Sequence, residues 1–297
     1  MTTVGLIGLG AMGSGMAASL RRAGHSVQVF DVRREVAAAF AQDGGVAHDT
    51  LASLGAACDV IVSVVVNAAQ TESVLFGDGT TPGCAASMKP GSVFVMCSTV
   101  DPNWSVALEA RLEAMGLRYV DAPISGGAAK AASGQMTMMT AGKPKAYAVA
   151  EPFLNAMAAK VYKLGDSAGA GSKVKIINQL LAGVHIAAAA DAMALGLREG
   201  VDPAALDAVI TNSAGNSWMF ENRMAHVLAA DYTPLSAVDI FVKDLGIVLD
   251  MARASKFPLP LSSTAHQMFM QASTAGFAKE DDSAVIKIFP GIELPKG

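Results

Sequence analysis

Charged residues and cysteines are both scarce in this 297-residue sequence. Charged residues make up 16% and hydrophobic residues 52%, so much apolar surface must be buried within or between subunits. The net charge of -4 comes without a basic stripe that could neutralise phosphates, which argues against nucleic acid as a partner. The histidines are few and dispersed along the chain, and we therefore expect no metal site.

The three cysteines are odd in number, widely spaced and set in mostly apolar surroundings: Cys58, Cys84 and Cys97. Their spacing fits neither a disulfide framework nor a zinc site. Disulfides are rare where glutathione keeps thiols reduced. The pattern therefore predicts reduced core residues and a cytoplasmic protein.

A membrane anchor is not expected either. The chain begins MTTVGLIGLG, which lacks the basic segment and the cleavage site of a signal peptide. The most apolar window, residues 176–197, is rich in alanine and is interrupted by polar side chains, among them Asn178, His185 and Asp191. We interpret this window as a buried helix of a protein that does not interact with membranes.

Short apolar segments alternate with helical patterns over the first half of the chain. The predicted strands cover residues 3–7, 27–30, 59–65, 92–98 and 118–123, with further candidates at 136–142 and 159–165. Such alternation is typical of a parallel sheet covered by helices on both faces. Beyond about residue 166 only helical patterns follow, at 171–199, 203–212, 218–229, 236–254 and 260–275. We predict an α/β domain over residues 1–165 and an all-α domain over residues 166–297.

A glycine-rich turn follows the first predicted strand and opens a helical pattern. The residues of this G-x-G-x-x-G motif are Gly8, Leu9, Gly10, Ala11, Met12 and Gly13. Between a strand and a helix, this motif binds the pyrophosphate of a dinucleotide. Gly8 would permit the tight turn, Gly10 the approach of the pyrophosphate, and Gly13 close packing of helix on sheet. Ala11 and Met12 would complete the cradle at the helix N-terminus.

An acidic residue, Asp31, ends the second predicted strand, 23 positions after Gly8. Its carboxylate would accept hydrogen bonds from the adenosine ribose and would repel a 2′-phosphate, which favours NAD over NADP. Arg33 and Arg34 keep NADP open as an alternative, because an arginine just past this strand can hold the phosphate.

Four sequence blocks carry a resemblance that covers essentially the whole chain. They are GLIGLGAMGSGMA (5–17), DAPISGGAAKAASG (121–134), GSKVKIINQ (171–179) and FVKDLGIVLDMA (241–252). In this order and spacing they resemble the β-hydroxyacid dehydrogenases, which include 3-hydroxyisobutyrate dehydrogenase. The resemblance implies a Rossmann-type N-terminal domain, a long connecting helix and an all-α C-terminal domain, with the active site in the cleft between the domains. It also implies a homodimer or homotetramer.

Two places depart from the family pattern. Ser19 stands where many members carry Asn in the first helix, and we expect it to pack rather than to react. Val66 and Asn67 stand where members often have Pro and a polar residue. This second departure affects a loop on the cofactor side, to which we assign Val66.

The family pattern G-x-x-x-K-x-x-N maps onto Gly171, Lys175 and Asn178 without a gap. Positions three apart share a helix face, so Lys175 and Asn178 could reach one substrate. A desolvated lysine near a positive nicotinamide should have a lowered pKa, which would suit a general base in alcohol oxidation. Asn178 would hold the substrate hydroxyl or carboxylate. Lys173 points elsewhere and is assigned to structure or surface.

Further site residues follow from the other blocks. Ser125 and the backbone N–H groups of Gly126 and Gly127, just past a predicted strand, could bind a substrate carboxylate. The resemblance implies that Ser98, Thr99 and Lys243 would contact the cofactor. We interpret Asp244 as a helix-surface partner.

The loop around Lys130 bears on the substrate. Lys130 stands where members commonly have a small residue, and the wording around it looks closest to members that oxidise the C2 hydroxyl of L-threonate to 2-oxo-tetronate. Alternatives within the family are members that act on 3-hydroxyisobutyrate or on tartronate or succinic semialdehyde. A non-catalytic nucleotide-binding module and an imine reductase are further alternatives, but such proteins tend to lose the lysine.

Four other polar or aromatic residues are weaker candidates. We interpret His185 as a core histidine rather than a wall of the site. Asn212, Asn216 and Trp218 are expected in a helix–helix loop that could reach over a substrate.

Overall fold

The structure, a computed structural model, describes residues 2–296 and divides into two compact units. The first unit extends to Lys175, and the second begins at Ile176. The boundary lies inside the long helix α8 (Ala170–Arg198), which therefore supplies residues to both units.

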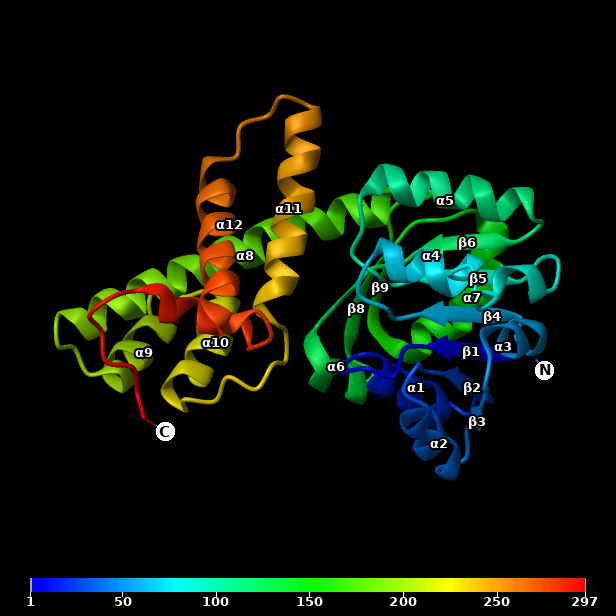
Figure 1. The fold of residues 1–297 in the computed structure, drawn as a ribbon, viewed down its shortest axis with the longest axis horizontal. Coiled ribbons are helices and arrows are strands. Elements are labelled where there is room, and N and C mark those ends of the chain that lie inside the picture. The colour runs from blue at the N-terminus through cyan, green and yellow to red at the C-terminus, as the bar shows by residue number, and fades with distance from the viewer. Residues whose placement is uncertain (1, 297) are drawn as a thin grey trace. The chain divides into compact units, whose positions relative to one another are not determined.

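A six-stranded sheet forms the centre of the first unit (Figure 1). Its strands are β1 (Val4–Ile7), β2 (Val27–Phe30), β3 (Val46–Ala47), β4 (Val60–Ser63), β5 (Val93–Met96) and β6 (Arg118–Asp121). They pair in the order β3-β2-β1-β4-β5-β6, and every pairing is parallel. The predicted Rossmann-type α/β fold class is confirmed, with β3 as a short strand that the apolar pattern did not indicate.

Helices cover both faces of this sheet, as the apolar strands require. The helices are α1 (Gly13–Arg22), α2 (Arg34–Gln42), α3 (Leu51–Ala57), α4 (Ala68–Phe76), α5 (Pro102–Ala114) and α7 (Pro144–Met157). Alternate residues of each strand face opposite sides. Val60 and Val62 pack in one core with residues of α1, α2 and α7, whereas Ile61 packs in another with residues of α3, α4 and α5. The free cysteines Cys58, Cys84 and Cys97 are all buried in these cores, as predicted.

A second, three-stranded sheet extends the first unit. It consists of β7 (Ile124–Ser125), β8 (Met136–Thr140) and β9 (Ala158–Lys163). The strand candidates at 136–142 and 159–165 are thus strands that pair with each other, and an isolated bridge between Ala141 and Asp121 joins the first of them to the main sheet. A short helix, α6 (Gly127–Ser133), connects β7 to β8.

Helices alone make up the regular structure of residues 176–296, apart from an isolated bridge between Ala237 and Asp281. Besides α8 they are α9 (Pro203–Thr211), α10 (Trp218–Leu228), α11 (Val238–Ala254), α12 (Pro260–Ala272), a π turn (Ser273–Phe277) and a 3-10 segment (Asp282–Ile288). The predicted all-α C-terminal part is confirmed. By length and composition alone α8 is apolar enough to cross a membrane. Its residues Ile186, Ala190 and Met193 instead belong to the core of the second unit.

Candidate functional site

The turn between β1 and α1 has the backbone geometry that a dinucleotide cradle requires. Gly8 adopts a positive φ of 92°, and a Cβ there would lie 2.6 Å from the carbonyl oxygen of Val64. A Cβ on Gly13 would lie 1.8 Å from the carbonyl oxygen of Gly8, so only glycine allows α1 to begin this close to β1. Both glycines are therefore needed to form the turn itself.

Space for an anion is left next to this turn. A Cβ on Gly10 would meet no atom within 4 Å, and Gly10 and Ala11 are exposed. Met12 precedes the first residue of α1 and makes no side-chain capping hydrogen bond. The first N–H groups of a helix favour an anion, and in α1 the Ser14 N–H already donates to the carbonyl oxygen of Gly10 at 3.1 Å. The residues present therefore fit the pyrophosphate of a dinucleotide.

Asp31, at the carboxyl end of β2, is buried beside the glycine turn. Its Oδ2 accepts a hydrogen bond from the Leu9 N–H at 2.7 Å, and its Oδ1 accepts from the backbone N–H and the Nε of Arg33 at 2.9 and 3.2 Å. Burial raises the pKa of Asp31, but the bonds from Arg33 and Leu9 outweigh it and lower the pKa overall. A carboxylate has about four acceptor positions, so Oδ2 keeps one for a ribose hydroxyl.

Three of the predicted cofactor residues, Val66, Ser98 and Thr99, follow the carboxyl ends of β4 and β5, and β4 pairs with β1, which the glycine turn follows. Ser98 is buried, and its hydroxyl donates to the carbonyl oxygen of Val65 at 2.7 Å. This bond ties the end of β5 to the loop that carries Val66, whose side chain is exposed. Thr99 is half-buried beside them. Asn67 caps α4, since its Oδ1 accepts from the Gln70 N–H at 2.8 Å, which explains a polar residue at this position.

The ISGG segment forms a strand and a helix start rather than a simple turn. Ser125 lies in β7 opposite Thr137, and Gly127 is the first residue of α6. Gly126 and Gly127 have positive φ values of 139° and 76°. The side chain of Lys130, on α6, folds over Gly126, where a Cβ would meet it at 3.0 Å.

Ser19 has the packing role expected of it. Its hydroxyl donates to the carbonyl oxygen of Ala131 on α6 at 3.0 Å and accepts from Arg22 at 2.7 Å. A Cβ on Gly15 would lie 2.5 Å from the N of Ala132, so α1 and α6 are in backbone contact. The serine thus links the glycine turn's helix to the helix that follows ISGG.

Lys175 and Asn178 lie on α8, one turn apart. Lys175 is buried, with 7% of its surface exposed, whereas Lys173 and Asn178 are exposed. The Asn178 amide donates from Nδ2 to the Oε1 of Gln179 at 3.1 Å. The side chain of Lys175 is therefore buried and that of Lys173 exposed, as the sequence predicted.

A buried carboxylate fixes the start of α8. The Oδ2 of Asp121, at the end of β6, accepts from the N–H groups of Gly169 and Ser172, each at 2.9 Å, and Oδ1 accepts from the Ser172 hydroxyl at 2.6 Å. Burial raises the pKa of Asp121, and the bonds from Ser172 and Gly169 oppose that rise. A Cβ on Gly171 would lie 2.4 Å from the Met139 carbonyl oxygen, so the glycine allows this close approach. These contacts anchor the turn of α8 that precedes Lys175.

Replacing Asp121 by alanine should destabilise the protein by about 1–3 kcal/mol, because it leaves the buried N–H groups of Gly169 and Ser172 without an acceptor. Asp121→Asn should retain most of the stability, since its oxygen can accept both N–H bonds and its amide can donate to the Ser172 hydroxyl. Thermal unfolding of both variants measures the difference. An equal loss in the two variants would show that these hydrogen bonds are not what stabilises the helix start.

Asp244 corrects the sequence interpretation, since it is not on the surface of its helix. It is 1% exposed on α11 and accepts from the Nε2 of Gln179 at 2.6 Å. It also forms an ion pair with Lys243. The contact between Asp244 and Gln179 was not predicted from the sequence, because it joins positions 65 residues apart.

The weaker candidates occupy varied positions in the second unit. His185 is half-buried on α8. The amide of Asn212, at the end of α9, donates to the carbonyl oxygen of Ala208, and that of Asn216 donates to the carbonyl oxygen of Thr211. Trp218 begins α10 and is exposed. The two asparagines therefore serve first to shape the α9–α10 connection.

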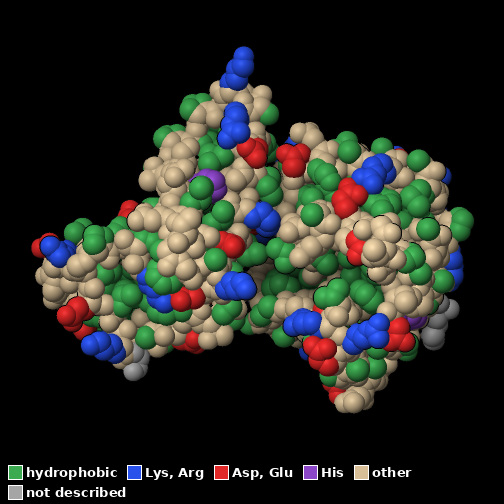
Figure 2. Space-filling model, in the orientation of Figure 1, with side chains coloured by type: hydrophobic (Ala, Val, Ile, Leu, Met, Phe, Trp, Pro, Cys, Tyr) green, Lys and Arg blue, Asp and Glu red, His purple; other side chains and the backbone are tan. Residues whose placement is uncertain are grey.

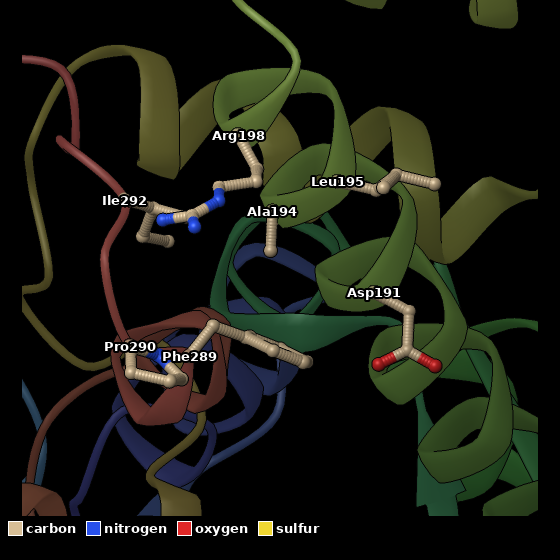
Figure 3. Close-up of a pocket in the computed structure, with 7 residues that line it drawn as sticks. All are labelled: Asp191, Ala194, Leu195, Arg198, Phe289, Pro290 and Ile292. Atoms are coloured by element: carbon tan, nitrogen blue, oxygen red, sulfur yellow. The ribbon is translucent and has the colours of Figure 1, made fainter.

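A cavity of about 440 Å³ lies elsewhere in the second unit (Figure 3). Asp191, Ala194, Leu195 and Arg198 line it from α8, and Phe289, Pro290 and Ile292 line it from the C-terminal segment. None of these lining residues is a predicted site residue. Asp191 follows Lys175 by 16 positions, which is about 24 Å along a helix. Among residues 2–296, no cluster of histidine, cysteine and acidic side chains could hold a metal ion.

Comparison with family models agrees with the geometry of both units. The model described as the NAD binding domain of 6-phosphogluconate dehydrogenase matches residues 3–165. The model described as NAD-binding of NADP-dependent 3-hydroxyisobutyrate dehydrogenase matches residues 169–289. An NAD(P) cofactor is thereby supported.

Individual proteins resemble the chain over nearly its full length. An L-threonate dehydrogenase of Cupriavidus necator is 67% identical over 292 residues, covering 98% of this chain and 97% of the relative. An L-threonate dehydrogenase of Escherichia coli K12 is 52% identical over 293 residues, covering 98% and 96%. A solved structure from Salmonella typhimurium, named 3-hydroxyisobutyrate dehydrogenase, has a TM-score of 0.93 at 52% identity, covering 97% and 100%. The chain therefore belongs to the β-hydroxyacid dehydrogenases related to 3-hydroxyisobutyrate dehydrogenase and is an NAD-dependent hydroxyacid dehydrogenase.

Proposed function

We propose that this enzyme oxidises L-threonate at C2 to 2-oxo-tetronate, with Lys175 as the general base. The names of the relatives at 67% and 52% identity support the substrate. The single observation that carries the mechanism is the burial of Lys175 one turn before Asn178 on α8. We propose that residues 1–165 bind NAD and that residues 166–297 serve the substrate and oligomerisation.

Oxidation of an alcohol removes a hydride from carbon and a proton from oxygen. NAD, when bound, accepts the hydride. In this proposal the neutral Nζ of Lys175 takes the hydroxyl proton and returns it in the reverse direction. The burial of Lys175 and its place one turn before Asn178 support this role.

The substrate would be held by three groups of donors and acceptors. Ser125 and the N–H groups of Gly126 and Gly127 would bind the carboxylate. Asn178 would hold a hydroxyl or the carboxylate through its amide. Lys130 would add a contact to the distal hydroxyls that a methyl-bearing acid lacks.

We propose that the cofactor is held by the cradle of Gly8, Gly10, Ala11, Met12 and Gly13, with Val66, Ser98, Thr99 and Lys243 on the nicotinamide side. Asp31 would hold the ribose. The Nε of Arg33 forms an ion pair with the Oδ1 of Asp31 at 3.2 Å. An arginine paired in this way is less available to a 2′-phosphate, which supports a preference for NAD over NADP.

Asp31→Ala should reduce this preference. Without the carboxylate, a 2′-phosphate meets no like charge and Arg33 is released to bind it, so the ratio of kcat/KM for NAD to that for NADP should fall about tenfold or more, about 1.4 kcal/mol. Initial rates with each cofactor at saturating acid measure the ratio. Adding Arg33→Ala should restore part of it, whereas an unchanged ratio in Asp31→Ala would refute the assignment of Asp31.

We further propose a cytoplasmic homodimer or homotetramer without nucleic acid or membrane partners. Ile177, Leu181 and Leu195 share one face of α8 and are 54%, 51% and 63% exposed, and such an apolar stripe usually marks a protein contact. Acidic and basic side chains are interspersed on the face drawn in Figure 2, without a stripe suited to phosphates. Sedimentation velocity should give a species of at least two chains, and a monomer at micromolar concentration would contradict the proposal.

The substrate is tested by following NADH absorbance with L-threonate, D-erythronate, 3-hydroxyisobutyrate, glycerate and 4-hydroxybutyrate. We expect the highest kcat/KM with L-threonate. Preference for 3-hydroxyisobutyrate would support the name of the Salmonella structure and refute the substrate while leaving Lys175 in place. Binding of NAD without turnover of any acid would indicate a non-catalytic module.

A further inference from the structure

Four polar side chains of the second unit form one hydrogen-bonded chain between α8 and α11. Asn178 donates from Nδ2 to the Oε1 of Gln179 at 3.1 Å, and Gln179 donates from Nε2 to the Oδ2 of Asp244 at 2.6 Å. Lys243 also donates to Asp244, through its Oδ1. The chain therefore links the predicted substrate residue Asn178 to the predicted cofactor residue Lys243.

The middle of this chain lies in a tightly packed helix contact. Gln179 is 8% and Asp244 1% exposed, and a Cβ on the nearby Gly183 would lie 3.0 Å from side chains of Phe241 and Leu245. Apolar residues at such positions would often be equally stable or more stable than a buried ion pair. A buried carboxylate and amide here thus have a cost in stability that packing does not explain, which suggests a role in positioning.

The hydrogen bonds between these four side chains also have a fixed direction. An ionised carboxylate only accepts hydrogen bonds, so Asp244 requires the NH₂ end of the Gln179 amide. The carbonyl end of Gln179 must then face Asn178 and can only accept, so Asn178 turns its own NH₂ toward it. This leaves the Oδ1 of Asn178 for the substrate, as an acceptor.

We propose that Gln179 and Asp244 are positioning residues that orient the Asn178 amide so that its Oδ1 accepts a hydrogen bond from a substrate hydroxyl, not from the carboxylate, while Asp244 fixes Lys243 for the cofactor. The proposal rests on the proposed function at Asn178 and Lys243. It decides between the two roles open for Asn178, because a carboxylate has no proton to donate to Oδ1 at neutral pH.

Two variants separate the two ends of the chain. Gln179→Met removes the amide hydrogen bonds to Asn178 and Asp244 at similar volume and leaves the Lys243–Asp244 ion pair. The value of kcat/KM for the hydroxy acid should therefore fall about tenfold, the size of a lost hydrogen bond, with the Kd for NAD unchanged. Asp244→Asn should lower kcat/KM for the acid similarly and also raise the Kd for NAD. Isothermal titration with NAD alone gives the Kd without turnover, and Asp250→Asn, an exposed site on α11, serves as the matched control.

A double-mutant cycle with Asn178→Ala gives the decisive result. In the Asn178→Ala background, Gln179→Met should cost no further activity, because the amide that it orients is gone. An equal, additive loss in both backgrounds would overturn the proposal, as would a Kd for NAD that Gln179→Met changes as much as Asp244→Asn does. The cycle uses whichever acid the wild-type enzyme oxidises best, so failure of L-threonate as the substrate is seen separately.

Discussion

Lys175→Ala is expected to lower kcat by about 10²–10⁴-fold, the usual contribution of a general acid or base. Lys175 is the buried lysine one turn before Asn178 on α8. Without its amine, the group proposed to take the hydroxyl proton as the hydride leaves is lost. The Kd for NAD should change little, because the residues assigned to the cofactor are intact. Steady-state rates and titration with NAD measure the two quantities separately.

Lys173→Ala is the matched control for this prediction. It removes the same kind of side chain two positions earlier, from an exposed position of the same helix. We expect near-normal kcat in this variant and the loss only in Lys175→Ala. In Lys175→Ala, the pH profile of kcat/KM should also lose the limb that reports deprotonation of the base, whereas Lys173→Ala should keep it. Near-normal turnover by Lys175→Ala would remove the lysine from the mechanism.

The second large effect is expected at the glycine turn, where two substitutions should fail in different ways. Gly10→Ala places a methyl group in open space, so the fold should be unaffected. That space is where the pyrophosphate would lie, so the Kd for NAD should rise at least about tenfold, or about 1.4 kcal/mol. Gly13→Ala would bring a Cβ to 1.8 Å from the Gly8 carbonyl oxygen and should destabilise the first unit by about 1–3 kcal/mol or more.

Thermal unfolding and NAD titration distinguish these two failures. Gly10→Ala should unfold at the wild-type temperature yet bind NAD weakly, whereas Gly13→Ala should lose both stability and binding. If Gly10→Ala bound NAD with wild-type affinity, the open space beside α1 would not be the pyrophosphate site.

Local patterns predicted most of the fold. The helix pattern at 203–212 corresponds to α9 (Pro203–Thr211), because Asp202 caps its N-terminus and Pro203 occupies its first turn. The segments 136–142 and 159–165 were correctly predicted to contain strands, but their place in a separate three-stranded sheet was not predicted. A short apolar strand carries no signal for its partner, since pairing depends on contacts distant in sequence.

The placement of a residue in the fold was predictable where a motif marks it and not where burial depends on a distant partner. Gly8, Gly13 and Asp31 follow from the strand–turn–helix context alone. The burial of Asp244 could not be foreseen, because a carboxylate on a helix is normally solvated unless a group such as the Gln179 amide meets it. The anchoring of α8 by Asp121 likewise depends on a contact that spans 51 positions to Ser172.

The measurement that tests the central claim most directly is the transfer of deuterium from L-threonate labelled at C2. If C2 is oxidised by hydride transfer, the label should appear at C4 of the reduced nicotinamide, the product should be the 2-oxo acid without label, and turnover limited by this step should slow. Label retained in the product, or released to water with none in the nicotinamide, would contradict the account.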